Sequence, residues 1–128
     1  MPRVELRLQP DPALLRVMRM TIGSTARLRD LSEPLVDDIR LAVTEAASEA
    51  IAAHTYAQID DPVAVVLDIG EDEVVVTVEH HGVHGRVPAT ATQSVDRLAV
   101  ASGMADDLRV REGADTTCVE LRWKTDQG

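Results

Sequence analysis

Two valine-rich segments, residues 62–70 (PVAVVLDIG) and 73–81 (EVVVTVEHH), are separated by only Glu71 and Asp72 after Gly70. β-Branched residues at this density favour extended backbone, and glycine followed by acidic residues is typical of a tight turn. The pair therefore predicts an antiparallel β-hairpin. The rest of the chain has to supply the layer against which this hairpin packs.

The segment before the hairpin predicts one strand and two helices. Residues 4–9 (VELRLQ) alternate apolar and polar side chains, which indicates a half-buried strand. Asp11 and Pro12 predict the start of a helix over residues 11–31. Ser32 is expected to cap a second helix that runs to about residue 54.

The segment after the hairpin predicts a loop, a helix and a second hairpin. Residues 82–93 (GVHGRVPATATQ) have no clear period and predict a loop that serves as a lid or binding segment. Residues 94–108 have helical spacing although they contain Gly103. Two short strands, 108–112 and 116–123, are expected to close the chain.

This order of elements separates the helices from antiparallel strands. It predicts an α+β fold, a two-layer α/β sandwich in which a mostly antiparallel sheet is covered on one face by helices. With 128 residues, of which 45% are hydrophobic and 27% charged, residues 1–128 are expected to form a single domain.

The net charge of −9 disfavours binding to nucleic acid or to an anionic membrane surface. No apolar run approaches the ~20 residues of a membrane span. The single cysteine, Cys118, excludes an internal disulfide, which is consistent with a cytoplasmic protein. In its strand context Cys118 is expected to be a packing residue rather than a nucleophile.

Glu45 and Glu49 lie one turn apart on the second predicted helix. On a helical wheel they fall at the margin of the apolar arc. Either they are a solvated pair, mildly destabilising by about 0.2–0.5 kcal/mol, or they line a site. The residues alone do not decide between these interpretations.

Three stretches together resemble the GHKL (Bergerat-fold) ATPases, and in particular the RsbW-like branch of anti-sigma factor serine kinases. They are residues 37–56 (DDIRLAVTEAASEAIAAHTY), 74–85 (VVVTVEHHGVHG) and 113–121 (GADTTCVEL). The likeness spans nearly the whole chain. It implies the Bergerat, or histidine-kinase-like ATPase, fold and makes ATP with magnesium a possible ligand.

The resemblance implies roles for the two glutamates. Glu45 matches the glutamate that polarises the attacking group in the family, so it is the catalytic residue if the protein is active. Glu49 stands where the family has the asparagine that holds magnesium. A carboxylate can ligate magnesium, but like charges about 4 Å apart repel by about 4 kcal/mol at an effective dielectric near 20.

The resemblance also implies nucleotide-contacting positions that this sequence alters. The family motif D-x-G-x-G reads His80, Gly82 and His84 here, and the closing pair of threonines is Thr116 and Thr117. Residues 94–100 (SVDRLAV) stand where the family has a glycine-rich phosphate loop, and they contain no glycine. These changes predict weak or absent nucleotide binding.

Two groups of residues outside the nucleotide motifs are candidate sites. His80, His81 and His84 include common zinc-ligand types, but adjacent strand residues point to opposite faces, so no metal site beyond possible magnesium is predicted. Arg16 and Arg19 lie on the only basic element of an acidic chain, and they are expected either to be solvated or to contact an acidic partner.

The resemblance implies an anti-sigma-like regulator. Such a protein sequesters an RNA polymerase sigma factor, is countered by an anti-anti-sigma antagonist of the STAS type, and can form a homodimer. One alternative is an active ATP-dependent serine kinase that phosphorylates the antagonist. A second alternative is a scaffold domain with other protein partners.

Overall fold

The computed structural model describes residues 3–81 and 91–125, with the backbone alone for residues 91–96. Within these ranges the elements follow one another in the predicted order of strands and helices. They are β1 (Arg3–Leu8), a 3₁₀ turn (Pro12–Leu14), α1 (Leu15–Leu28), α2 (Glu33–Ala57), β2 (Val63–Ile69), β3 (Glu73–His81), α3 (Ala91–Met104), β4 (Asp107–Glu112) and β5 (Thr116–Lys124).

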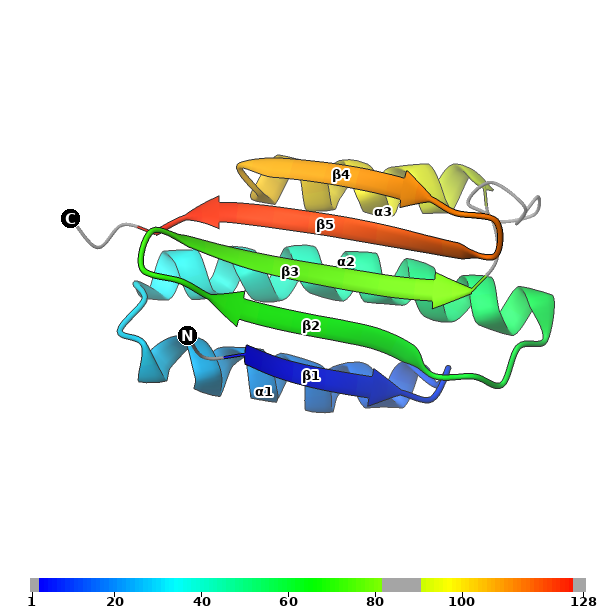
Figure 1. Cartoon of the computed structure of the whole chain (residues 1–128), viewed down its shortest axis with the longest axis horizontal. Coiled ribbons are helices and arrows are strands. Elements are labelled where there is room, and N and C mark those ends of the chain that lie inside the picture. The colour runs from blue at the N-terminus through cyan, green and yellow to red at the C-terminus, as the bar shows by residue number, and fades with distance from the viewer. Residues whose placement is uncertain (1–2, 82–90, 126–128) are drawn as a thin grey trace.

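The strands described form one sheet in the order β1-β2-β3-β5-β4, and every neighbouring pair is antiparallel. All three α-helices lie on the same face of this sheet (Figure 1). α2 runs behind the middle strands, α1 lies on the β1 side and α3 lies on the β4 side. The predicted two-layer α+β fold is confirmed.

The hairpin of β2 and β3 forms as predicted because its valines alternate between two environments. Residues 63, 65, 67 and 69 of β2 are buried toward the helices, and the intervening residues are half-buried on the open face. β3 repeats this alternation and pairs with β2 from Ala64↔Glu79 to Ile69↔Val74. The open face carries charged pairs, such as Arg122 with Glu73 at 2.8 Å.

α2 is the central helix of the covering layer. The Ser32 hydroxyl accepts a hydrogen bond from the Leu35 amide at 3.4 Å, and the helix ends at Gln58, whose φ of 56° is left-handed. The helix thus runs three residues beyond the predicted end at residue 54. Five of its eleven buried residues are alanines, and such small side chains allow the helix backbone to approach the valine-rich strands. The buried residues are Val36, Ile39, Ala42, Val43, Ala46, Ala47, Glu49, Ala50, Ile51, Ala53 and His54.

The boundaries of the other two helices differ from the prediction. Asp11 caps the 3₁₀ turn, through a hydrogen bond from the Ala13 amide at 2.9 Å, and α1 follows it. α3 begins at Ala91 and ends at Met104 instead of spanning 94–108. Two contacts fix its end, because Trp123 donates its indole N–H to the Met104 carbonyl at 2.8 Å and the Asp106 amide already bonds to β5.

None of the helices in the described part of the chain combines the length and the apolarity needed to cross a membrane. Among the described residues, the hydrophobic core between the layers consists of aliphatic side chains together with Met18 and Trp123, which is 3% exposed. Alanines of α2 such as Ala46 are part of this core, so we expect a larger side chain there to disturb the packing of helix and sheet.

Substitution of Ala46 by leucine tests this packing. Ala46 is 1% exposed, so a larger side chain has no free volume and is expected to cost about 1–3 kcal/mol of unfolding free energy. Ala57→Leu, at an exposed position on the same helix, is the matched control and should change stability by less than about 0.5 kcal/mol. Urea denaturation measures both, and equal effects would contradict close packing at Ala46.

Candidate functional site

The two glutamates of α2 lie in different environments. Glu45 is half-buried, whereas Glu49 is 4% exposed. The prediction that both border the core is correct for their positions on α2. The solvated-pair interpretation is wrong for Glu49, because α3 covers that margin of the helix.

Glu49 is paired with a cation from α3. Its Oε2 atom lies 3.8 Å from Nη1 of Arg97, whose side chain is 30% exposed. Both atoms are buried, and neither has a hydrogen-bond partner among the described residues. The sequence did not single out Arg97, since the helical period of α3 does not show which of its residues meets α2.

His54 is fully buried near the end of α2 and connects three segments of the chain. Its Nδ1–H donates to the Asp61 carbonyl at 2.8 Å, because a carbonyl can only accept. Its Nε2 accepts a hydrogen bond from the His81 amide at 2.8 Å. The ring is therefore a neutral tautomer that joins α2 to the α2–β2 connection and to the end of β3.

Burial is the main influence on the acidity of His54. It lowers the pKa of the imidazole below its ordinary value of 6.5, and the nearby rings of His80 and His81 act in the same direction. The hydrogen bond to the Asp61 carbonyl partly opposes this effect. Protonation of Nε2 would also remove the acceptor of the His81 amide, so the folded protein favours the neutral ring.

His80 is buried and His81 is exposed at the end of β3, and the rings of both lie next to His54. His80 is 3% exposed on the helix side, its ring 5.9 Å from that of His54 in an edge-on arrangement. Its Nδ1 lies 2.9 Å from the His81 carbonyl, which makes it a donor to backbone. The His81 ring stacks on that of His54 at a centroid distance of 5.6 Å.

The predicted threonine pair lies beside these histidines. Thr117 is opposite His80 in the β3–β5 register and is fully buried, and Thr116 is opposite His81 and half-buried. The structure thus brings together His80 and Thr117 from the predicted nucleotide positions. Gly82 and His84 lie outside the described residues. In the described ranges, no three His, Cys, Asp or Glu side chains are placed to hold a metal ion.

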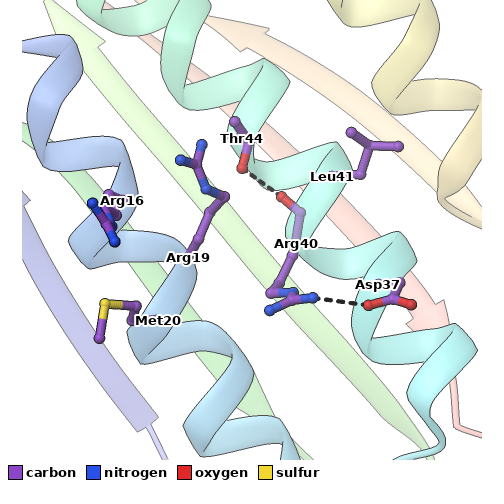
Figure 2. A pocket seen from close by; sticks show the side chains of 7 residues that line it. All are labelled: Arg16, Arg19, Met20, Asp37, Arg40, Leu41 and Thr44. Carbon is purple, nitrogen blue, oxygen red and sulfur yellow. Dashed lines mark hydrogen bonds and ion pairs between the residues drawn. The ribbon is translucent and has the colours of Figure 1, made fainter.

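A basic groove lies on the outer side of the helix layer, between α1 and α2. Arg16, Arg19 and Met20 line it from α1, and the lining residues from α2 are Asp37, Arg40, Leu41 and Thr44 (Figure 2). The cavity has a volume of about 480 Å³. The structure therefore places the two predicted partner-contacting arginines in one concave surface, which we call the α1/α2 groove.

The charges of the α1/α2 groove are only partly balanced. Arg40 donates to Asp37 at 2.9 Å, whereas Arg16 and Arg19 form no ion pair with other residues in the described ranges. Arg40 and Met20 were missed by the sequence analysis. The antiparallel pairing of the two predicted helices would have placed Arg40 opposite Arg19.

A second cavity, of about 450 Å³, lies further along α2. It is mostly apolar, and Arg97 contributes the charged group at its wall. The lining residues are Pro12, Leu15, Ser48, Ile51, Ala52, Thr55, Tyr56 and Arg97. Neither cavity on the helix layer is lined by Glu45, His80 or Thr117.

The buried histidine gives a prediction about pH. Since the pKa of His54 is lower in the folded than in the unfolded state, its contribution to stability is complete above about pH 6.5 and declines as the pH falls through that value. Urea unfolding of the wild type at pH 7.5 and 5.5, compared with His54→Gln, should show a smaller pH dependence in the variant. An identical pH dependence would contradict the neutral buried ring.

At neutral pH, His54→Ala is expected to cost about 2–4 kcal/mol, because it leaves the amide of His81 and the carbonyl of Asp61 without this partner and opens a cavity. His81→Ala is the matched control, since its side chain is 46% exposed and its amide remains in place. The control should cost less than about 1 kcal/mol.

Comparison with known proteins identifies one family and a group of structural neighbours, two of which are described below. The family model of the histidine kinase-like ATPase domain matches residues 8–123. A search of curated proteins finds no significant match.

The first neighbour is the structure of the RsbU and RsbW domains of Rv1364c from Mycobacterium tuberculosis. It has a TM-score of 0.79 and 17% identity, and the match covers 98% of this chain and 33% of the other, so this chain spans about a third of its neighbour's length. The second neighbour is the SiaB–SiaC complex from Pseudomonas aeruginosa. It has a TM-score of 0.59 and 11% identity, covering 94% and 89% of the two chains. At these identities the neighbours establish the fold.

Proposed function

Because the chain belongs to the histidine kinase-like ATPase domain family, we propose that it acts as an anti-sigma-like regulator. In this proposal it sequesters an RNA polymerase sigma factor, is released by a STAS-type antagonist, and works with weak or no nucleotide binding. The neighbours support a role in protein–protein regulation, since one contains an RsbW domain and the other is a two-protein complex. Cytoplasmic location and homodimer formation are part of this proposal.

The observation that carries the proposal is the pairing of Glu49 with Arg97 at 3.8 Å. In the position that would ligate magnesium, the carboxylate already has a cation from the protein itself. Binding of Mg–ATP would require the guanidinium to leave, and the triphosphate would then lie beside two carboxylates, Glu45 and Glu49. The residues present therefore do not fit magnesium and a triphosphate.

The position of His80 supports the same conclusion. Where the family has an aspartate that accepts a hydrogen bond from adenine, this chain has a buried imidazole whose Nδ1 faces the His81 carbonyl at 2.9 Å. An imidazole with Nδ1 as donor has only Nε2 left as an acceptor, in contrast to the two oxygens of a carboxylate.

The α1/α2 groove is the proposed partner-binding surface. It places Arg16 and Arg19, which have no ion pair in the described ranges, beside the exposed apolar side chains of Met20 and Leu41. Positive charge at this surface of a chain with net charge −9 favours an acidic partner segment with apolar anchors. Such a contact increases the association rate most strongly at low salt.

One observation favours the alternative of an active serine kinase. Glu45, at the position of the family's catalytic glutamate, is half-buried and so remains accessible from solvent. In that case Glu45 would polarise the attacking hydroxyl. This reaction still requires a nucleotide at the position that Arg97 and His80 obstruct, so we favour the regulator without a kinase step.

Isothermal titration with Mg–ATP, together with pull-down against sigma factors and STAS-type proteins from the same source, tests the proposal. We expect capture of a partner in the absence of nucleotide and no saturable ATP binding in the micromolar range. Micromolar ATP binding with phosphorylation of the captured STAS-type protein would establish the kinase instead. Failure to capture any partner of either class would contradict the regulatory proposal.

Charge substitution in the groove tests the binding surface. The double variant Arg16→Ala/Arg19→Ala is expected to weaken partner affinity by about tenfold or more and to flatten its salt dependence. Arg3→Ala/Arg7→Ala removes the same net charge from exposed positions of β1 and is the matched control. Surface plasmon resonance measures the affinities. An equal loss of affinity in both double variants would mean that net charge causes the effect, and it would contradict the proposal that the α1/α2 groove binds the partner.

A further inference from the structure

Glu49 has the most buried acidic side chain among the ion pairs in the described part of the chain. Its side chain is 5% exposed, while the next most covered, that of Glu120, is 11% exposed. A carboxylate at this depth is strongly disfavoured unless a cation lies close by. The burial of Glu49 therefore depends on how its charge is balanced.

The residues of α2 next to Glu49 cannot balance this charge. The positions three and four residues away on the same helix are Glu45, Ala46, Ala52 and Ala53. Three are alanines and the fourth is a second carboxylate, which adds negative charge one turn away. The balancing positive charge therefore has to come from another element. Arg97 of α3 lies next to the Glu49 carboxylate and supplies it.

The contact is a charge pair without hydrogen-bond geometry. Glu49 Oε2 and Arg97 Nη1 are 3.8 Å apart, and both atoms are buried without a hydrogen-bond partner in the described ranges. Arginine usually meets a carboxylate with two parallel hydrogen bonds. Since this pair lacks them, the site requires a positive charge near Glu49 more than it requires the shape of a guanidinium.

We propose that Arg97 is a built-in counter-cation that takes the place of a divalent metal ion at Glu45 and Glu49 and, by doing so, holds α3 against α2 without nucleotide. This inference deepens the proposed nucleotide-independent function and rests on it. Removal of the guanidinium leaves two carboxylates one helical turn apart. Such a pair of hard oxygen donors is a binding site for a divalent cation such as Mn²⁺ or Mg²⁺.

Thermal unfolding, followed by circular dichroism in EDTA and in millimolar Mn²⁺, tests the proposal with the wild type and three variants. Arg97→Ala should unfold several degrees below the wild type in EDTA and recover most of the difference in Mn²⁺. Arg97→Lys, which keeps the charge, should stay close to the wild type. The wild type, Arg97→Lys and the double variant Glu49→Gln/Arg97→Ala should not respond to Mn²⁺.

Arg27→Ala is the matched control, because Arg27 and Glu33 form an ion pair at 3.0 Å with both side chains about half exposed or more. It should change the unfolding temperature by no more than about one degree and give no Mn²⁺ response. If Arg97→Ala is unfolded in EDTA, recovery of the native spectrum on adding Mn²⁺ supports the proposal, and no recovery overturns it.

Three further results would overturn the inference: Arg97→Ala as stable as the wild type, an equal Mn²⁺ response in the wild type, or an undiminished Mn²⁺ response in the double variant. These outcomes are separable from the proposed function. If the protein captures a partner without nucleotide but Mn²⁺ does not restore the stability of Arg97→Ala, the proposal for Arg97 is wrong and the proposed function stands. If Mn²⁺ restores the stability of Arg97→Ala but the wild type binds ATP, the nucleotide-independent function is wrong and the proposal for Arg97 stands.

Discussion

The burial of α2 is the constraint on which the rest of the structure depends. The helix packs on the valine-rich strands through small side chains such as Ala46, and α1 and α3 flank it (Figure 1). Any polar side chain on its covered surfaces must therefore find its partner inside the protein. Glu49 does so through Arg97, and His54 does so through two backbone groups.

These internal partners account for the proposed loss of nucleotide binding within a family whose fold this chain retains. In an ATP-binding site the carboxylates and acceptors are left open for metal and base, whereas here several of them are engaged by the protein itself. Arg16 and Arg19, which form no ion pair in the described ranges, lie on the outer side of the helix layer. In the proposed function, this surface binds the partner protein and the interior of the helix layer binds no nucleotide.

The sequence predicted the fold well because periodicity reports which face of an element is buried. The β2–β3 hairpin, the cap at Ser32 and the difference in burial between His80 and His81 all followed from local patterns. The burial of Glu49 was not predictable, since it depends on where α3 lies. Likewise, the role of His54 depends on backbone groups distant in sequence, and no local pattern reports them. The predicted contributions of Gly82 and His84 fall outside the described residues and stay predictions.

The most direct measurement of the central claim is a crystal structure determined from crystals grown in a large excess of Mg–ATP. The account predicts that the Arg97 guanidinium remains beside the Glu49 carboxylate and that no nucleotide lies between α2 and α3. A structure in which a magnesium ion is bound at Glu45 and Glu49, with the adenine beside His80 and Arg97 displaced, would contradict it.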